Sequence, residues 1–557
     1  MAETSTQVDL RLFRHRSLAL SHLGGLLGCF SWSFRAEDGT GTLPKEKISL
    51  LWRELNINPH EGERVLSRVQ AEGDEVNLQD WAKMLAHVDE LHVQAVFAAV
   101  HQDLDDIKPE SMAEFFGQVQ KIRPAPSLRQ VQRLFWRLPS VQEPRLSLET
   151  LAQLLCSPGN SLADPAKRVL FQDMGQPLYA YYVDTSHNTY LEGNQLSSRS
   201  SVLRFVEVLR AGCRSVEVDV WDGSNGEPVV KHGYTVTTEV LFQDVIRAIA
   251  DHAFVASEYP VIISIDQHCS APQRLRQGEI LTEVLGEQLL RPPWDEHLQR
   301  FDYTKSFHIT PDSARRRFLV KSLICEGSLA YDSCVALPTR KLLQKLVEHG
   351  LGLNSSPAQE SSWPWNVASG TAAKVQKLER CIGRVGMCSW TSSHLARAYP
   401  EGTRIGSDNV DPVPVWLAGV QMVALNYQTS DIGLLLNQGL FRDYNGSCGY
   451  VLKPPMVAKK PSKLWLCICC GHRLPRPDGS PIVSSPTVAV SLHPSGQVSQ
   501  SQTVAEDGYH PVFNHDVLLE VSDSPLHILT FEASRPIRLS NARPTSVTTK
   551  LARIRTR

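Results

Sequence analysis

The feature that most constrains the fold is a regular alternation of short apolar runs with helix-like segments over residues 175–323. The apolar runs are SVEVDV, EPVVKH, YPVIISID and RRFLVKSLI. Around and between them lie SSVLRFVEVLRAG, TEVLFQDVIRAIADHAF and EILTEVLGEQLL, whose apolar residues recur at helical spacing. Strands that alternate with helices build a parallel sheet covered by helices. The alternation therefore predicts an α/β fold for this part of the chain.

Polar side chains stand at the ends of these predicted strands, where α/β barrels place their chemistry. Six of them are candidate site residues: His187, Asn188, Glu217, Asp219, His232 and Asp266. Each of these residues taken alone, for example His187 or Asn188 in DTSHNTY, is better explained as an ordinary polar group in a turn. Six at four successive strand ends favour a functional site.

The chemistry of this set is coherent. In SVEVDV the valines alternate with Glu217 and Asp219, so a period of two puts both carboxylates on one face of a strand. Two adjacent acids are costly unless a cation lies between them. Three carboxylates and an Asn carbonyl are hard oxygen ligands, which suit Ca²⁺ and not zinc. Two histidines beside such a cation can stabilise developing charge and move a proton.

The chain of 557 residues is too long for one core, and three or four domains are expected. Residues 17–165 have helical periodicity and acidic or glycine-containing loops, which is typical of EF-hand pairs. Lys47 stands where a bidentate Glu should close a 12-residue calcium loop. We therefore expect an EF-hand-like helical domain whose degenerate loops bind no calcium.

The remaining segments are assigned by composition and pattern. Residues 324–362 are polar and Ser-rich and are interpreted as a linker or insertion between two half-barrels. The α/β alternation resumes over 363–456, and 462–535 have the short alternating strands of an all-β domain. Residues 536–557 are basic, without a clear core, and are expected to fray.

Charge, cysteines and hydropathy limit the surroundings. The formal net charge is −2, so no global basic field favours nucleic acid. The twelve cysteines form no disulfide framework, and LWLCICC fits a strand with buried thiols better than a zinc site, which indicates a reducing compartment. LALSHLGGLLGCFSW resembles a signal sequence but lacks a cleavage site and is too short to span a bilayer, so we favour a buried helix.

Longer motifs make the sequence identifiable. SHNTYLEGNQLSSRSS, GCRSVEVDVWDG, EPVVKHGYT, YPVIISIDQHCS and FLVKSL resemble the X half of the eukaryotic phosphoinositide-specific phospholipases C. SSHLARAYPEGTRIGSDNVDPVPVWLAGVQMVALNYQT and GLFRDYNGSCGYVLKP resemble the Y half. The resemblance covers roughly residues 17–535 and is closest to the delta and zeta types, without an N-terminal pleckstrin-homology domain.

The resemblance implies a multidomain α/β protein. Its centre would be a TIM-type (β/α) barrel, with an X half over 175–323 and a Y half over 363–456. All-α EF-hand-like helices would precede the barrel, and an incomplete all-β C2 sandwich over 462–535 would follow it. The first loop of this domain has Asp478 as its one clear acid, so no calcium is expected there.

The resemblance also implies a role for each site residue. His187 would stabilise the phosphoryl transition state, and His232 would protonate the departing diacylglycerol oxygen. Asn188, Glu217, Asp219 and Asp266 would hold Ca²⁺, with Glu217 or Asp266 also serving as the base for the inositol 2-hydroxyl. The contacts to the inositol ring and its phosphates would come from Lys321, Ser369, Arg397 and Tyr399.

The sequence departs from the family pattern at several places. Asp266 stands where a Glu is usual and Leu323 where a second Lys is usual, while Tyr234 replaces a His. The strand that usually opens the Y half is not evident. Either ALPTRKLL or a neighbouring segment supplies it, or the barrel is a variant with an open edge.

Two functions follow from these observations. The first is a calcium-dependent phospholipase C that hydrolyses phosphatidylinositol 4,5-bisphosphate through a cyclic phosphodiester. The second is a weak or inactive relative that binds phosphoinositides or proteins as a scaffold. In both cases we expect a cytoplasmic protein that contacts a phosphoinositide membrane surface peripherally, without a membrane span and without nucleic acid.

Overall fold

The computed structural model describes most of the predicted barrel and C-terminal β-domain, and short stretches of the N-terminal region. The described residues are 165–291, 294–295, 300–301, 309–322, 334–338, 366–442, 444–455, 461–471, 485–505, 507–534 and 547–553, with scattered residues between 42 and 135. The chain divides into two compact units, of which one is formed mainly by residues 166–460 and the other by residues 1–165 with most of 461–550.

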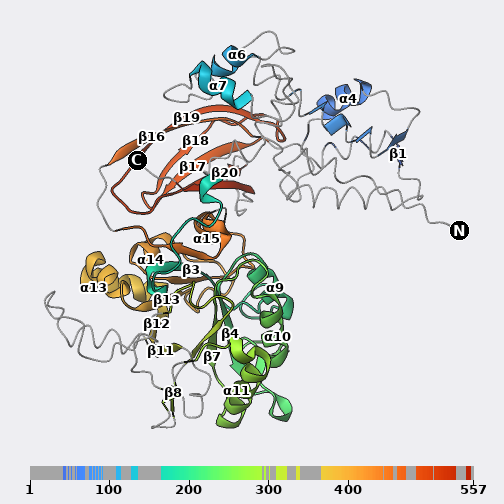
Figure 1. Ribbon diagram of the computed structural model, residues 1–557. Coiled ribbons are helices and arrows are strands. Elements are labelled where there is room, and N and C mark those ends of the chain that lie inside the picture. Colours follow the sequence, from blue (N-terminus) through green and yellow to red (C-terminus); the bar gives the residue numbers. More distant parts are fainter. Residues whose placement is uncertain are drawn as a thin grey trace. The chain divides into compact units, whose positions relative to one another are not determined.

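The centre of the first unit is a closed barrel of eight parallel strands (Figure 1). In spatial order the strands are β3 (Tyr181–Ser186), β4 (Ser215–Trp221), β7 (Val261–Gln267), β10 (Phe318–Ser322), β11 (Cys334–Pro338), β12 (Asn366–Thr371), β13 (Leu395–Tyr399) and β14 (Met422–Leu425). The ring closes because β3 pairs in parallel with both β14 and β4. This confirms the predicted α/β barrel.

Helices cover the outside of the barrel. They are α9 (Val202–Arg210), α10 (Phe242–His252), α11 (Ala271–Leu285), α13 (Ala372–Thr391), α14 (Val413–Leu417) and α15 (Ile432–Phe441). The valines of β4 face this layer, where Val216 and Val218 belong to the same buried cluster as Phe205 and Phe242. Because side chains alternate across a strand, Glu217 and Asp219 are directed into the barrel.

Strand β11 completes the ring at the place where the sequence left the strand open. It pairs in parallel with β10 and with β12. Its residues lie inside the range 324–362 that was interpreted as a linker, so this part of the range belongs to the barrel. The strand CVALP has five residues, and this short apolar run does not predict a strand by itself. The strand is stabilised by parallel pairing on both sides.

One expectation about the strand ends was wrong. His232 does not follow a parallel barrel strand, because β5 (Val229–Val230) pairs antiparallel with β4, and β6 (Val240–Leu241) pairs antiparallel with β5. The VV run is a hairpin strand that extends the sheet from the carboxyl end of β4. A second antiparallel strand, β15 (Tyr450–Leu452), pairs with β3.

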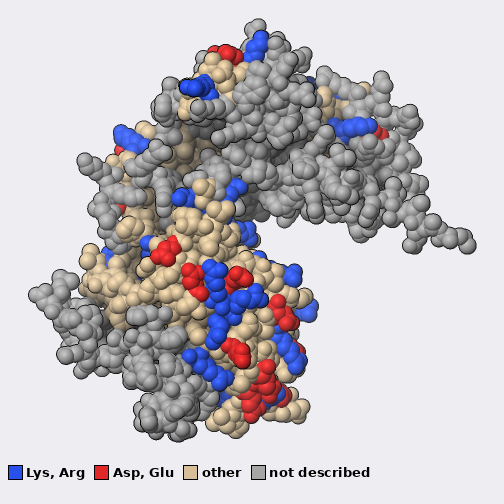
Figure 2. All heavy atoms as spheres, in the orientation of Figure 1, with Lys and Arg blue, Asp and Glu red and all other residues tan. Residues whose placement is uncertain are grey.

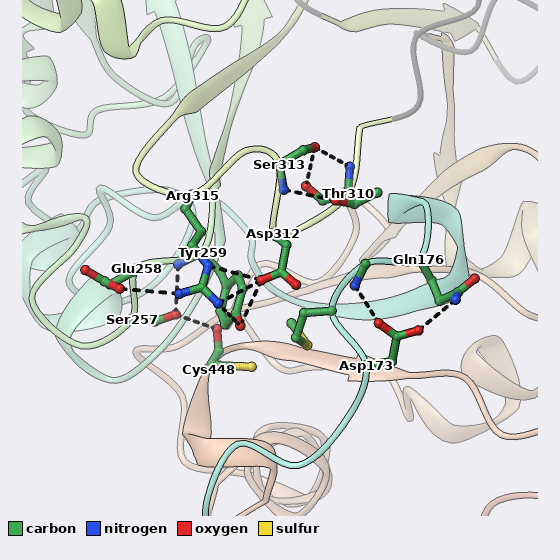
Figure 3. Close-up of polar contacts among 12 residues, drawn as sticks. Asp173, Gln176, Ser257, Glu258, Tyr259, Thr310, Asp312, Ser313, Arg315 and Cys448 are labelled. Atoms are coloured by element: carbon green, nitrogen blue, oxygen red, sulfur yellow. Dashed lines mark hydrogen bonds and ion pairs between the residues drawn. The ribbon is translucent and has the colours of Figure 1, made fainter.

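The other end of the barrel is held by polar contacts. Figure 3 shows Arg315 beside the ring of Tyr259 and the carboxylate of Asp312, with Glu258 close by. These residues lie just before β7 and β10, at the amino ends of the strands. In barrels of this kind that end contributes to stability and the opposite end carries the chemistry.

Charged side chains on the helices are largely matched. On the visible face of the barrel, Lys and Arg lie among Asp and Glu (Figure 2), and ion pairs such as Arg204–Glu207 and Arg276–Glu279 run along α9 and α11. None of the helices among the described residues is long and apolar enough to cross a membrane.

A small hairpin is formed by β8 (Trp294–Asp295) and β9 (Arg300–Phe301).

The C-terminal β-domain contains two described sheets. Strands β16 (Ser462–Cys470) and β19 (Val512–Val521) pair antiparallel, and β17 (Thr487–His493), β18 (Gln497–Gln500), β20 (Ile528–Ser534) and β21 (Val547–Arg553) form a second sheet. Strand β21 lies in the segment 536–557 that was expected to fray. It is the edge strand beside β20, and edge strands tolerate basic, weakly apolar sequences.

In the N-terminal region the described helices are α4 (Pro59–Arg68), α6 (Pro109–Glu114) and α7 (Leu128–Phe135). The short strands β1 (Thr42–Pro44) and β2 (Glu75–Asn77) lie in two of the acidic or glycine-containing loops that the sequence predicts in this region, and they pair antiparallel. This pairing fits two EF-hand-like loops side by side. Lys47, the signal-like segment and Leu323 lie outside the described residues, as does Asp478.

Candidate active site

The candidate residues come together inside the carboxyl end of the barrel. Glu217 and Asp219 lie on β4, Asp266 lies opposite Asp219 on β7, and Arg397 lies opposite Ser369 on the neighbouring pair β13 and β12. The hydrogen bonds, ion pairs and electrostatic effects described below connect His187, Asn188 and His232 to the same group. The structure therefore brings these candidate residues near one another, and their assignment as a functional site stays a prediction.

Glu217 is the most strongly paired acid of the site. Its Oε2 lies 2.7 Å from Arg397 Nη2 and accepts the backbone N–H of Asn188 at 3.0 Å. The Arg397 Nη2 group is not aligned as a hydrogen-bond donor, so the contact is an ion pair. Burial alone would raise the pKa of Glu217, but Arg397, His187 and the Asn188 N–H together hold this pKa below its ordinary value.

The pKa of Asp219 is shifted in the opposite direction. Burial and the nearby carboxylates of Glu217 and Asp266 raise its pKa well above the ordinary value, although the hydroxyl of Tyr190 donates to Oδ2 at 2.7 Å. The other oxygen, Oδ1, is buried and has no hydrogen-bond partner among the described residues. Such an oxygen is costly to bury without a partner, and it can accept a hydrogen bond or contact a cation.

Asp266 lies near these acids but pairs with a histidine. Its side chain is 53% exposed, and Oδ2 lies 3.3 Å from His268 Nε2. The hydrogen bond from His268 lowers the pKa of Asp266. The ring of His268 is itself stacked on Trp221, with 4.1 Å between ring centroids. The shorter side chain at this position therefore pairs with a histidine in the structure.

His187 follows β3 directly and is held on both sides. Its Nδ1 lies 3.0 Å from Asn426 Oδ1, and its Nε2 lies 3.9 Å from Glu217 Oε2. The ring is parallel to that of Tyr399 at a centroid distance of 6.4 Å. Burial lowers the pKa of His187, and the Glu217 carboxylate only partly opposes this effect.

His232 lies on the loop after β5 and faces the same acids. Burial lowers its pKa, while a hydrogen bond to the backbone of Gln195 and the charges of Glu217 and Asp266 act in the opposite direction. Its Nδ1 is buried and has no hydrogen-bond partner among the described residues. A neutral ring with one unused nitrogen is suited to proton transfer.

The four predicted phosphate-binding residues lie on β10, β12 and β13. Lys321 Nζ donates to Ser264 Oγ at 3.1 Å, and the guanidinium of Arg397 lies 5.4 Å from the ring centroid of Tyr399. Ser369 Oγ and Arg397 Nε are buried without a hydrogen-bond partner among the described residues. Donors left in this way inside a polar pocket can bind an anionic ligand.

The donors fit a cation by their chemistry, but they are not arranged around one. Among the described residues no group of three or more His, Cys, Asp or Glu side chains forms a metal site. The reason is visible in the contacts, since Arg397 occupies Glu217 and His268 occupies Asp266. Asp219 Oδ1 has no hydrogen-bond partner in the part of the chain that the structure describes. The NH₂ of Asn188 faces Gln195 at 2.8 Å, so the carbonyl oxygen of Asn188 is directed away from Gln195.

The sequence did not reveal the residues that hold the site in place. Tyr190, Gln195, Ser264, His268 and Asn426 contact site residues through hydrogen bonds or ion pairs. Tyr190 and Gln195 belong to the quoted motif SHNTYLEGNQL, so proximity in that motif was a usable signal. Asn426 lies 239 residues from His187 and no local pattern points to it.

Comparisons with known proteins agree with this arrangement. The family model of the phosphatidylinositol-specific phospholipase C X domain matches residues 174–323, and the model of the Y domain matches residues 344–456. Human 1-phosphatidylinositol 4,5-bisphosphate phosphodiesterase delta-1 is 30% identical over 519 residues, which cover 82% of this chain and 67% of that protein. The chain belongs to the phosphoinositide-specific phospholipase C family.

Other members of this family are similar to the chain over shorter spans. The human delta-4 phosphodiesterase is 33% identical over 453 residues, covering 69% of this chain and 58% of that protein. The chain thus spans less than two thirds of the length of such relatives. The crystal structure of PLC21 from L. pealei has a TM-score of 0.69 at 24% identity, covering 92% of this chain and 73% of that chain, and supports the fold.

Proposed function

We propose that this chain is a calcium-dependent phospholipase C. It hydrolyses phosphatidylinositol 4,5-bisphosphate to diacylglycerol and inositol 1,4,5-trisphosphate by way of a cyclic phosphodiester. The observation that carries the proposal is a set of buried polar atoms at the carboxyl end of the barrel that have no hydrogen-bond partner within the described part of the chain: Asp219 Oδ1, His232 Nδ1, Ser369 Oγ and Arg397 Nε. One acceptor for a cation and several groups for an anion match a phosphodiester bound beside a metal ion.

Four residues would hold the cation: Asn188, Glu217, Asp219 and Asp266. Bound Ca²⁺ would lower the pKa of a hydroxyl in contact with it and neutralise negative charge. It would also remove the repulsion that raises the pKa of Asp219. Since calcium binds six to eight oxygens at about 2.3–2.6 Å, Asp266 would have to leave His268 to join the others.

The chain's own residues would divide the reaction between them. Glu217, kept ionised by Arg397 and Asn188, would accept the proton of the inositol 2-hydroxyl as it attacks phosphorus. His187 would stabilise charge on the phosphoryl oxygens, and His232 would give a proton to the departing diacylglycerol oxygen. Water would then open the cyclic phosphodiester.

Arg397 would exchange partners during binding. In the structure it neutralises Glu217, whereas a phosphate would offer its planar guanidinium a bidentate anion. Lys321, Ser369 and Tyr399 would complete the contacts to the inositol ring and its phosphates. These four residues would therefore favour substrates that carry phosphates on the ring.

Access to the lipid would be peripheral. Exposed apolar side chains lie on the loops near the barrel mouth, including Leu196, Tyr234, Val236 and Ile405. These loops contact one another, since Val236 N donates to Leu196 O and Gln195 N donates to Ile405 O. Such a group of apolar side chains suits the surface of a phosphoinositide-containing membrane. We infer a cytoplasmic protein that binds this surface.

A second function is favoured by one observation, which is the engagement of Glu217 by Arg397 and of Asp266 by His268. If these pairs persist in the presence of calcium, the chain binds phosphoinositides or proteins as a scaffold without hydrolysing them. The two functions therefore differ in whether the pairs yield to the cation.

The deciding experiment uses purified protein and radiolabelled phosphatidylinositol 4,5-bisphosphate in mixed micelles, with calcium or with a chelator. Calcium-dependent release of water-soluble inositol phosphate, lost in the His232→Ala variant, supports the enzyme. Lipid binding without release at any calcium concentration supports the scaffold. The Asp266→Glu variant should raise the rate, because the longer carboxylate reaches further toward Asp219.

A further inference from the structure

Gln195 contacts two of the residues assigned to the site, Asn188 and His232, and the supporting residue Asn426. It is buried, with 7% of its surface exposed, and lies on the loop that follows His187 and Asn188. Its Oε1 accepts from Asn188 Nδ2 at 2.8 Å, its Nε2 lies 3.3 Å from Asn426 Oδ1, and its backbone hydrogen-bonds to His232. We propose that Gln195 is a positioning residue that fixes the Asn188 amide and the His187 imidazole.

The orientation of the Gln195 amide follows from a backbone carbonyl. Gly193 O can only accept, and the hydroxyl of Ser407 donates to it at 2.8 Å. The single hydrogen of Ser407 is then used, so Ser407 Oγ must accept from Gln195, whose Nε2 lies 2.8 Å away. The NH₂ of Gln195 therefore faces Ser407, and its carbonyl oxygen faces Asn188.

The Asn188 amide is oriented in turn. Because Gln195 Oε1 only accepts, the group that Asn188 directs toward it must be the NH₂. The carbonyl oxygen of Asn188 is on the other side of the planar amide and is left for a cation. The backbone N–H of Asn188 donates to Glu217, which keeps this residue beside the proposed ligands.

The same amide sets the tautomer of His187. The second hydrogen of Gln195 Nε2 points to Asn426, so the Asn426 atom that it meets is the carbonyl oxygen. That oxygen also lies 3.0 Å from His187 Nδ1, which must then carry a hydrogen. Nδ1 of His187 is thereby fixed as the donor to Asn426, and Nε2, on the side of Glu217, is the nitrogen that would carry a proton to stabilise a phosphoryl oxygen.

The local backbone agrees with a rigid support. Ser407 is fully buried and has φ of 61°, and Asn188 has φ of 39°, although neither is glycine. Residues other than glycine adopt this conformation at a cost in free energy and persist in it where their surroundings determine them. The hydrogen bonds of Gln195 join these two strained positions.

The proposal rests on the cation site proposed above and is tested by cation binding. Calcium titration calorimetry on the full chain measures the affinity of the barrel site, defined as the binding that is lost in Asp219→Ala. The Gln195→Met variant keeps the size of the side chain and removes its amide. Loss of such a supporting hydrogen bond should weaken calcium binding by about tenfold or more.

A matched control is available on the same carbonyl. Gln428 Nε2 donates to Gly193 O at 3.2 Å, so Gln428→Met removes a neighbouring amide and should leave calcium affinity unchanged. If Gln195 acts through Asn188, then Gln195→Met should cause no further loss in an Asn188→Ala background. Additive losses, or parental affinity in Gln195→Met, would overturn the proposal.

A second readout separates this proposal from the cation site itself. A crystal structure of Gln195→Met should show the Asn188 amide or the His187 ring rotated from its present position. Both side chains retained in place would overturn the positioning role. If the parent chain binds no calcium at the barrel, the cation site fails, and this structural comparison still decides the role of Gln195.

Discussion

Two of the acids of this site are paired with basic side chains. Arg397 lies on Glu217, His268 lies on Asp266, and Asp219 keeps one oxygen without a hydrogen-bond partner among the described residues. Such pairs stabilise the protein only while no ligand contacts the same carboxylates. A cation bound as proposed would have to compete with these pairs for the same carboxylates.

The pair between His268 and Asp266 is the weaker of the two because both side chains are partly exposed. Ion pairs of that kind are worth about 0.2–1 kcal/mol. In the His268→Phe variant, the ring can still stack on Trp221, but Asp266 loses its partner. We expect calcium affinity to rise by up to about fivefold in calorimetry. A fall in affinity would mean that His268 supports Asp266 as a ligand.

Much of the site could be predicted from single residues, and the limits are physical. The histidines, the acids and Arg397 lie in long motifs, so they could be chosen as candidate site residues from the sequence. The partner of a side chain depends on rotamers and distant strands, which no local pattern encodes. For this reason Asn426 and the turn of Asp266 toward His268 were missed, although His268 is two residues away in the sequence.

At the scale of secondary-structure elements, the hydrogen bonds of Arg214 stabilise the amino end of the barrel. This residue is fully buried and donates to the carbonyls of Leu209, Ala253 and Ser257, at the ends of α9 and α10 and in the loop before β7. In Arg214→Met these carbonyls lose their donor, at about 1–3 kcal/mol for each buried group. We expect the urea midpoint to fall sharply.

The exposed Arg315 provides the control for this prediction. Its ion pairs with Asp312 and Glu258 lie at the same end of the barrel, but its side chain is 47% exposed. Arg315→Met should cost no more than about 1 kcal/mol in the same urea titration. Equal losses in the two variants would contradict the stabilising role assigned to Arg214.

A lysine that follows β15 contacts the C-terminus of α13. Lys453 Nζ donates to the carbonyl of Thr391, and burial lowers the pKa of Lys453 from 10.5 to about 7. The unfolded chain then binds more protons than the folded chain between pH 7 and 10.5, so this residue makes stability rise with pH across that window. Below pH 7 its full penalty remains.

The Lys453→Met variant removes this titration. We expect its thermal midpoint to exceed that of the parent at pH 6–7, and the difference to shrink or reverse by pH 10. The measurement is a pair of melting curves recorded over that pH range. A difference that stays constant with pH would show that the amine is not held neutral by burial.

The elements were predicted unevenly for a simple reason. Strands flanked by long amphipathic helices were identified because the period changes from two to 3.6 along the chain. Strand β11 has five residues, and β21 is a basic edge strand, so neither carries an apolar pattern of its own. Strand β5 was predicted as part of the parallel ring because pairing direction is decided by the tertiary fold, and β6 lies at the start of a segment that was predicted to be helical.

At the scale of the whole molecule, the proposed activity requires contact with a lipid surface. The apolar side chains at the barrel mouth include Tyr234 and Val236, which are 98% and 80% exposed. Burying one such side chain is worth about 1.5–3 kcal/mol. The double variant Tyr234→Ser, Val236→Ser should therefore reduce binding to phosphatidylcholine vesicles containing phosphatidylinositol 4,5-bisphosphate by tenfold or more.

An exposed apolar residue elsewhere on the barrel serves as the control. Val385 on α13 is 75% exposed, and Val385→Ser should leave vesicle binding unchanged in a sedimentation assay. Hydrolysis of a soluble inositol phosphodiester should be the same in all three proteins. Equal vesicle binding by the parent and the double variant would place the membrane contact on another surface.

The account as a whole depends on a single divalent cation held at the carboxyl end of the barrel. The most direct measurement is anomalous diffraction from crystals of the full chain soaked with calcium or a lanthanide. We predict one strong peak between Asn188, Glu217 and Asp219, with Arg397 displaced from Glu217. The absence of a peak there, with the Arg397–Glu217 ion pair unchanged in saturating cation, would contradict the account.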